Sequence, residues 1–212
     1  MSNKAIIFDL DGTLVDSVPL ILKCYSEGLS KHGITPVKEK ILALMGLPTL
    51  NVVLELVGEN INVRIEEVIK DIFDCFSRTW MNELRLYPGI EEVLNKLREK
   101  GYKLGIVTSS EQEHAEIMLD FFKLKKYLDI VQGRVDHLKP KPYPDMILYV
   151  LNQLKVESEN ALYVGDTFHD CVASAKANVK FILVERGWGG KFLRGCLPWK
   201  ILNELKELLV FT

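Results

Sequence analysis

The sequence AIIFDLDGT, at residues 5–13, places four apolar residues directly before two closely spaced acids. An apolar run of this kind predicts a buried strand, whereas carboxylates need water or a cation. Residues i and i+2 of a strand point to the same side, so Asp9 and Asp11 should project together where the strand ends. Gly12 then allows a sharp turn. The stretch therefore predicts a buried strand that delivers two acids to one edge of a sheet.

From about residue 88 onward, short apolar runs alternate with helical patterns. The runs lie at 104–107, 130–131, 161–164 and 181–184, and the helical patterns at 90–97, 115–122, 147–154 and 172–177. Apolar strands separated by helices predict a parallel sheet that is covered on both faces. A last helical pattern runs from Ile201 to Leu209. We therefore expect an α/β fold with a Rossmann-like, three-layer α/β/α core.

Residues 17–86 differ, because their apolar residues recur at spacings of three and four, as in amphipathic helices. The clearest patterns begin at Val18 and Ile65, with shorter ones near 37–45 and 49–57, and no convincing strand lies among them. Pro88-Gly89 marks the return to the sheet. We predict an all-helical cap at residues 17–86, inserted into a core of residues 1–16 and 87–212.

The composition argues against several classes of function. A formal net charge of −2 over 212 residues gives no indication of the basic surface that binds nucleic acid. No segment approaches the ~20 apolar residues of a membrane span. The four cysteines, at 24, 75, 171 and 196, form no CxxC pair. Such isolated cysteines predict reduced thiols. We expect a cytoplasmic protein without nucleic-acid or membrane partners, either a monomer or a small homo-oligomer.

A second pair of acids follows the apolar run at 161–164, in the segment Gly165-Asp166-Thr167-Phe168-His169-Asp170. Ligands of open parallel sheets bind beyond the carboxyl ends of the strands. If this strand neighbours the first one, the acids converge, and carboxylates so close together need a cation. Oxygen ligands favour Mg²⁺. Asp170 has an alternative role as the acid of a Thr167-x-x-Asp170 helix cap, and His169 is expected to be exposed or hydrogen-bonded rather than catalytic.

Two further segments suit an anionic ligand. The run at 104–107 ends in Thr108-Ser109-Ser110, and Ser110 with Glu113 matches a capping box that predicts the start of a helix. A helix N-terminus beside hydroxyl groups is a ready phosphate site. The loop at 138–142 then offers Lys139 and Lys141 as point charges for a phosphoryl group. Chemistry alone does not choose between these lysines.

Taken in order, the motifs resemble those of the haloacid dehalogenase superfamily, whose C1-type helical cap follows the first motif. The matching residues are Asp9-x-Asp11-Gly12-Thr13, then Thr108, then Lys139, then Gly165-Asp166-x-x-x-Asp170. The flanking sequences are similar to those of the phosphoglycolate phosphatase/β-phosphoglucomutase branch. They are Leu14-Val15-Asp16-Ser17 and Tyr87-Pro88-Gly89-Ile90.

The resemblance implies a Mg²⁺-dependent phosphatase that hydrolyses a small phosphomonoester, such as phosphoglycolate, a sugar phosphate or a nucleotide. Asp9 would be the nucleophile that forms an aspartyl-phosphate, and Asp11 the general acid and base. Asp9, Asp166 and the main-chain carbonyl of Asp11 would hold the metal, with Asp170 bound directly or through water. A superfamily dehalogenase needs no acid at position 11, so Asp11 points to phosphoryl chemistry.

The resemblance also assigns Thr108, Ser109 and Lys139 to the phosphate, because Lys139 matches the Lys-Pro motif of the family. Ile21 stands where the mutase branch has a cap histidine, which makes a phosphosugar mutase the weaker alternative. A pyrophosphatase of the same branch and a non-catalytic binding module that keeps the fold remain open.

Substrate specificity is expected to come from the cap. Gly46 is a candidate hinge of a loop over the site, or only a helix C-cap. Three basic residues, Arg64, Lys70 and Arg78, are candidates for contact with a substrate carboxylate or for solvent. The glycine-rich segment at 187–190 is expected near the site, with no assigned role.

Overall fold

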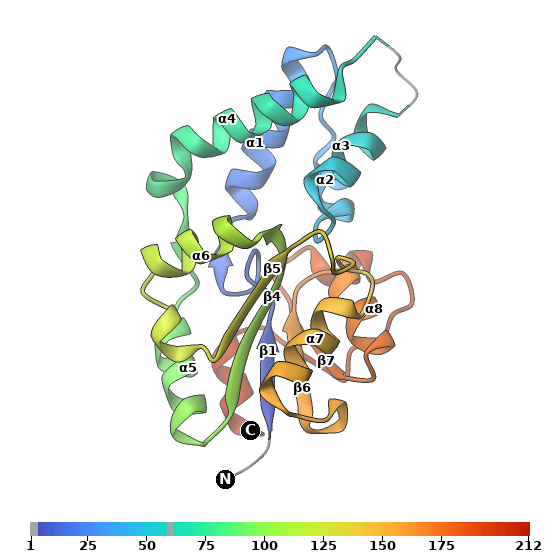
Figure 1. Cartoon of the computed structure of the whole chain (residues 1–212). Helices are drawn as coiled ribbons and strands as arrows, with labels where there is room; N and C mark the ends of the chain where they lie inside the picture. The colour runs from blue at the N-terminus through green and yellow to red at the C-terminus, as the bar shows by residue number, and fades with distance from the viewer. Residues whose placement is uncertain (1–3, 59–61) are drawn as a thin grey trace.

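The computed structural model describes residues 4–58 and 62–212. Six strands form one parallel sheet in the order β5-β4-β1-β6-β7-β8 (Figure 1). The strands are β1 (Ala5–Phe8), β4 (Lys103–Glu111), β5 (Ile130–Arg134), β6 (Ala161–Gly165), β7 (Lys180–Val184) and β8 (Lys200–Leu202). The first strand lies between β4 and β6, where the chain order of the sheet reverses. The predicted parallel α/β sheet is therefore confirmed.

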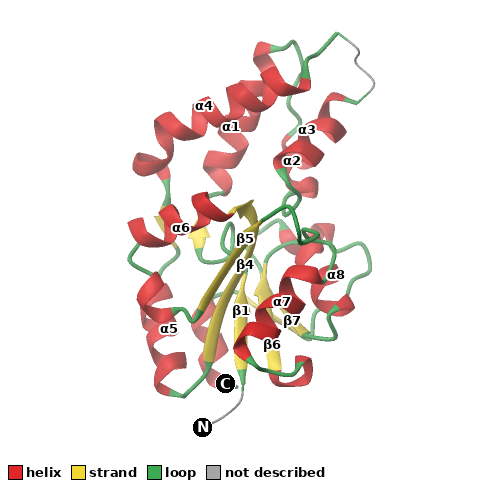
Figure 2. Ribbon diagram, in the orientation of Figure 1, coloured by secondary structure: helices red, strands yellow, loops and turns green. Residues whose placement is uncertain are grey.

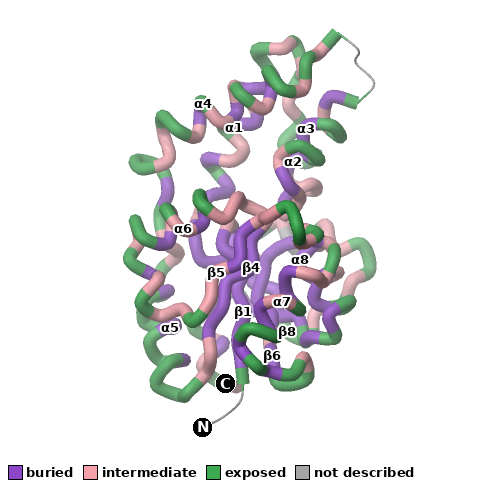
Figure 3. The backbone as a smooth tube through the Cα atoms, viewed as in Figure 1, coloured by how far each residue is buried: buried purple, intermediate pink, exposed green. Residues whose placement is uncertain are grey.

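Helices cover both faces of this sheet (Figure 2). One face packs against α5 (Ile90–Glu99) and α6 (Gln112–Phe121), and the other against α7 (Asp145–Leu154) and α8 (Phe168–Lys176). Alternation along β1 explains the two cores, because Ile6 and Phe8 join the first and Ala5 and Ile7 the second. Both faces of the central strands are thus buried (Figure 3), which accounts for their continuous apolar sequence.

Four helices stand beyond one end of the sheet (Figure 1). They are α1 (Val18–Lys31), α2 (Lys38–Leu44), α3 (Thr49–Val57) and α4 (Ile65–Glu83), and we call them the helical unit. Each coincides with a helical pattern predicted from the sequence. A short antiparallel pair, β2 (Val15–Asp16) and β3 (Arg85–Leu86), joins the two connections to the sheet. Neither of these short strands was predicted.

The cysteines contradict the sequence-based prediction. Cys24 of α1 is bonded to Cys75 of α4, and Cys171 of α8 is bonded to Cys196. The first pair is separated by 51 positions in the sequence and has a Cα–Cα distance of 5.4 Å. The second pair is separated by 25 positions and has a Cα–Cα distance of 6.2 Å. Both distances are within the range that a disulfide bridges. Sequence spacing could not reveal these meetings. The cysteine argument for a reducing compartment therefore fails, and cytoplasmic location remains a prediction.

The C-terminal helical pattern was also wrong. Residues 200–202 form β8, which pairs with β7, and Leu205–Val210 form a 3₁₀ helix. Leu205 and Leu208 are both buried, at the three-residue spacing of a 3₁₀ turn. Within the described residues, no helix combines the length and apolarity needed to cross a membrane.

Candidate active site

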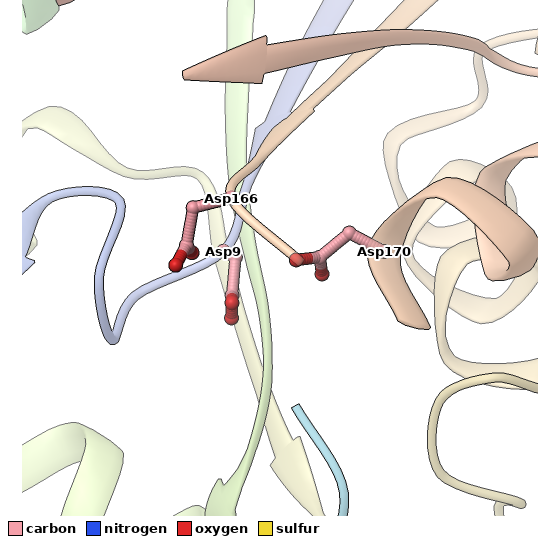
Figure 4. Close-up of side chains that lie close together, drawn as sticks. All are labelled: Asp9, Asp166 and Asp170. Atoms are coloured by element: carbon pink, nitrogen blue, oxygen red, sulfur yellow. The ribbon is translucent and has the colours of Figure 1, made fainter. Parts of the chain in front are cut away.

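Three buried carboxylates meet at the carboxyl ends of β1 and β6. Phe8 and Val164 are register partners in these adjacent strands, and the Asp9 amide donates to the Val164 carbonyl over 2.9 Å. Asp166 directly follows β6, and Asp170 lies in the first turn of α8. Carboxylate oxygens of Asp9, Asp166 and Asp170 lie within 4.8 Å of one another (Figure 4). The predicted convergence of these acids is thus present.

Two glycines allow this close approach. Gly12 has a φ of 78°, and a Cβ there would lie 2.3 Å from Oδ2 of Asp166. A Cβ on Gly165 would lie 2.6 Å from Cγ of Asp170. Any larger residue at either position would displace a carboxylate, so the glycines that flank the acids are required by the packing of the acids.

Asp170 is satisfied by four hydrogen bonds. Its Oδ1 accepts from Lys141 Nζ at 2.7 Å and from the Tyr163 hydroxyl at 3.0 Å. Its Oδ2 accepts from the Thr167 amide at 3.0 Å and from the Thr167 hydroxyl at 2.6 Å. Thr167 and Asp170 also form a full capping box at the start of α8. Both roles considered for Asp170, cap residue and member of an acid cluster, therefore occur together.

Asp166 is held by two donors, one to each of its carboxylate oxygens. The Thr13 hydroxyl donates to Oδ1 at 2.9 Å, and the Trp188 indole donates to Oδ2 at 3.0 Å. Burial, reinforced by the negative charge of Asp170, raises the pKa of Asp166 to about 7. A cation beside this carboxylate would offset the cost of ionising it in a buried position.

Lys141, and not Lys139, is the lysine of the site. Its side chain is buried, with Nζ 2.9 Å from Oδ1 of Asp9 and 2.7 Å from Oδ1 of Asp170. Lys139 is exposed, and its Nζ lies 5.1 Å from the ring centroid of Tyr143. The placement expected for Lys139 from the Lys-Pro motif is therefore corrected. The loop carries the ammonium two residues further along the chain.

One ammonium group faces three carboxylates in this cluster. Burial, and then the charge of Asp170, raise the pKa of Asp9 well above its usual range, although Lys141 opposes them. Burial alone would raise the pKa of Asp170, but the charge and hydrogen bond of Lys141 lower it. Burial would lower the pKa of Lys141, yet Asp170 and Asp9 raise it, so the ammonium stays charged. The remaining negative charge and the hard oxygen donors fit a divalent cation.

The hydroxyl segment that follows the apolar run of β4 differs from the prediction. The strand continues to Glu111, which is the N-cap residue of α6, and no capping box forms between Ser110 and Glu113. Ser110 instead donates to Oδ2 of Asp11 at 2.9 Å. The Ser110 hydroxyl, which was expected to cap the helix, therefore binds the carboxylate of Asp11 instead.

The other two hydroxyls of this segment lie at the site in different ways. Thr108 is buried, and its Oγ1 accepts from the Ser110 amide at 3.2 Å. Ser109 donates to the main-chain carbonyl of Gly46 at 2.5 Å. Asp9, Asp11, Thr108 and Ser109 all line one cavity of about 410 Å³, so Asp9 is the member of the carboxylate cluster that faces a space of ligand size.

The loop at residues 45–47, between α2 and α3, closes part of this cavity. His169 is buried, and its Nδ1 donates to the Met45 carbonyl at 2.7 Å. A Cβ on Gly46 would lie 2.7 Å from Oγ1 of Thr167. His169 therefore links the helical unit to α8, in agreement with the hydrogen-bonding role expected for it, and Gly46 is a point of close approach.

Sequence reasoning missed three residues that support the acids. The sequence offers Lys141 only as the alternative to Lys139, and it identifies Tyr163 only as part of a buried strand. Trp188 lies in the glycine-rich segment for which no role was assigned. For Trp188 there was a signal, since an indole between glycines can reach inward from a loop and needs a hydrogen-bond acceptor when buried.

Comparisons with known proteins identify the family of the chain. The family profile described as "Haloacid dehalogenase-like hydrolase" matches residues 6–184. Pyrophosphatase PpaX of Bacillus cereus is 31% identical over 212 residues, with 99% of this chain and 96% of that protein covered.

Solved structures give the same fold. A predicted phosphatase from Clostridium acetobutylicum has a TM-score of 0.83 and 29% identity, with 97% of this chain and 95% of that chain covered. A hydrolase of the haloacid dehalogenase-like family from Streptococcus pneumoniae has a TM-score of 0.84 and 24% identity, with 100% and 99% covered.

Proposed function

Because the chain belongs to the haloacid dehalogenase-like hydrolases, we propose that it is a Mg²⁺-dependent phosphatase that acts on a small phosphomonoester. The observation that carries the proposal is the buried cluster of Asp9, Asp166 and Asp170 beside Lys141, from which Asp9 and Lys141 line the 410 Å³ cavity. Relatives and structural neighbours that are named as phosphatases or pyrophosphatases support it.

Two residues carry the covalent chemistry in this proposal. A carboxylate oxygen of Asp9 attacks phosphorus, the bond from phosphorus to the ester oxygen breaks, and Asp11 gives that oxygen a proton. In the second step Asp11 takes a proton from water, whose oxygen attacks the aspartyl-phosphate and releases phosphate and free Asp9. Asp11 lies at the cavity wall, where its carboxylate is fixed by the bond from Ser110.

The phosphoryl oxygens are bound by Thr108 and Lys141, both of which line the cavity. Lys141 replaces Lys139 in this role, and it also offsets the charge of Asp9 during the approach of an anionic substrate. Ser109 retains a structural part, since its hydroxyl holds the carbonyl of Gly46.

The residues that would hold Mg²⁺ are Asp9 and Asp166, together with the main-chain carbonyl of Asp11. Asp170 already accepts four hydrogen bonds, so we assign it to water-mediated contact with the metal and to the orientation of Lys141. When bound, Mg²⁺ neutralises charge between the nucleophile and the phosphate.

The helical unit serves in this proposal as a cap, with residues 17–86 inserted into a core of residues 1–16 and 87–212. Its loop at 45–47 contacts Ser109 and His169 of the core. Closure of such a loop excludes water from the reaction.

The experiment that tests the proposal uses Asp9→Asn. With Mg²⁺ and a generic aryl phosphate, the parent should release phosphate, and the variant should lose at least about 10³-fold in kcat, since the nucleophile is absent. Asp120→Asn is the matched control, because Asp120 is an exposed acid on α6. Equal turnover of Asp9→Asn and the parent would refute the assignment.

A second candidate is a pyrophosphatase, which one observation favours: the 31% identical relative from Bacillus cereus carries that name. Pyrophosphate would use the same nucleophile, with phosphate as the leaving group. The release of phosphate from inorganic pyrophosphate, compared with phosphomonoesters at equal Mg²⁺, separates the two. A phosphosugar mutase is less well supported, because Ile21 lines the cavity where that branch has a histidine.

A further inference from the structure

The cavity beyond the carboxylates is lined mainly by apolar and aromatic side chains. The apolar and aromatic residues that the helical unit adds to its wall include Ile21, Phe73, Phe76 and Trp80, and α6 adds Ile117. The polar residues that the helical unit adds, Ser17 before α1, Thr49 and Ser77, are uncharged. The wall that faces the leaving group of a substrate bound at Asp9 is thus largely apolar and uncharged.

Cations are scarce at this wall. Among the described residues that line the cavity, the basic side chains are Lys141, Arg134 and, when protonated, His114. Lys141 is engaged by Asp9 and Asp170, and Arg134 forms an ion pair with Glu111 of the same cavity. His114 is exposed and lies against the ring of Phe73. A second anionic group on the substrate would therefore lack an uncommitted lysine or arginine.

The basic residues of the helical unit that were candidates for a substrate carboxylate lie elsewhere. Arg64 pairs with Glu67, Lys70 with Asp74, and Arg78 with Glu27, in each case at the protein surface. None of the three lines the cavity. The three residues lie on the solvent face of the helices, which is the alternative that the sequence offers for them.

We propose that the substrate is the phosphomonoester of an apolar, aromatic alcohol, whose ring packs against Phe76 and Trp80. The inference rests on the proposed phosphatase function and refines it. Pyrophosphate or phosphoglycolate would bring a second anion into an apolar wall, where an unpaired charge is strongly disfavoured. An aromatic ring gains from burial in the same place, and the cavity of about 410 Å³ has the size of sites that hold such ligands.

The test compares kcat/KM for 1-naphthyl phosphate, phosphoglycolate and inorganic pyrophosphate with the full chain and Mg²⁺. We expect the naphthyl ester to exceed each of the others by at least about tenfold, the discrimination that apolar contacts supply. Preference for phosphoglycolate would overturn the inference and leave the phosphatase assignment standing. Preference for pyrophosphate would overturn the inference and favour the pyrophosphatase candidate. If the parent hydrolyses none of the three, the proposed function fails, and the inference fails with it.

Variants locate the preference in the cavity. Phe76→Ala should reduce the ratio of naphthyl ester to phosphoglycolate by about tenfold or more, because it removes ring contacts. Met81→Ala is the matched control, since Met81 lies on the same helix, is 59% exposed and does not line the cavity. Equal ratios for the two variants would contradict the assigned ring site.

A second variant guards against misfolding of Phe76→Ala. Ile117 lines the cavity and is 46% exposed, so Ile117→Lys adds a cation at a position that tolerates a polar side chain. It should shift the ratio toward phosphoglycolate. An unchanged ratio in a folded Ile117→Lys protein, as judged by circular dichroism, would count against the charge argument.

Discussion

The ammonium of Lys141 lies 2.7 Å from Oδ1 of Asp170, and both side chains are buried. The same ammonium lies 2.9 Å from Oδ1 of Asp9. Because Asp170 accepts its other bonds from Tyr163 and Thr167, it is fixed on three sides. Lys141 is therefore anchored by one acid and presented to another.

Lys141→Ala should reduce kcat by about 10²–10³-fold, the loss typical for removal of one charge-stabilising group at a reaction centre. Lys139→Ala should stay close to the parent, because Lys139 is exposed and contacts the ring of Tyr143. Steady-state phosphate release from both variants, at saturating Mg²⁺, measures the difference. A larger loss for Lys139→Ala would restore the residue that the Lys-Pro motif suggests.

The pair Lys139 and Lys141 shows where sequence reasoning stops. The acids could be predicted, because each follows an apolar strand and the alternation of a strand decides which side chains share a side. The two lysines share one loop and one chemistry. Only the path of the loop between β5 and α7 buries one and exposes the other, and that path depends on contacts with α8 and β1 that are distant in sequence.

The distinction between local sequence patterns and contacts distant in sequence also explains the other differences between prediction and structure. Helices α1 and α4 were predicted from local periodicity, but the bond between Cys24 and Cys75 depends on how these helices pack. At the C-terminus, the periodicity of Ile201, Leu205 and Leu208 fitted a helix. The edge of β7 offers residues 200–202 a ladder of hydrogen bonds instead, and tertiary pairing overrides local preference.

Without metal, the stability of the protein should fall as pH rises between about 4 and 7. Burial raises the pKa of Asp166 from 3.8 to about 7, and Asp9 shifts in the same direction. An acid with a raised pKa in the folded state stabilises that state below its unfolded pKa, and the contribution is lost as pH rises through the folded value. Asp170 has the opposite shift, so its contribution is lost only below this window.

Thermal unfolding in EDTA should therefore give a lower Tm at about pH 8 than at about pH 5. Mg²⁺ should recover the loss at the higher pH, since it binds the ionised acids of the folded state. Asp166→Asn should flatten the dependence in EDTA, whereas Asp120→Asn, which changes an exposed acid, should keep it. A Tm in EDTA that rises steadily over this range would contradict the expected sign.

The disulfide between Cys24 and Cys75 should stabilise the helical unit. The bond closes a loop of 51 residues between α1 and α4, and a loop of that length corresponds to about 2–4 kcal/mol of stability through the unfolded state. Denaturant unfolding of Cys24→Ser with Cys75→Ser should show this loss. The matched comparison is Cys171→Ser with Cys196→Ser, whose loop spans 25 residues.

Thiol titration gives the direct check of these bonds. Denatured protein that has not been exposed to reductant should show no free thiol, and reduction should release all four cysteines. Four reactive thiols before reduction would mean that the bonds do not form where the protein is produced, and would revive the original expectation of reduced cysteines.

Gly46→Ala should reduce kcat/KM by about 10²-fold, because a misplacement of about 1 Å at a reaction centre has effects of this size. Gly46 has a φ of 89°, and a Cβ there would lie 2.7 Å from Oγ1 of Thr167, so the loop must move away from α8. That movement breaks the bonds from Ser109 and His169 to the loop carbonyls. Gly33→Ala is the matched control, since Gly33 has a φ of 72° with nothing within 4 Å. Both variants should lose about 1–2 kcal/mol of stability from the left-handed backbone, but only Gly46→Ala should lose activity. Equal activity of the two variants in a phosphate-release assay would show that closure by this loop does not matter for turnover.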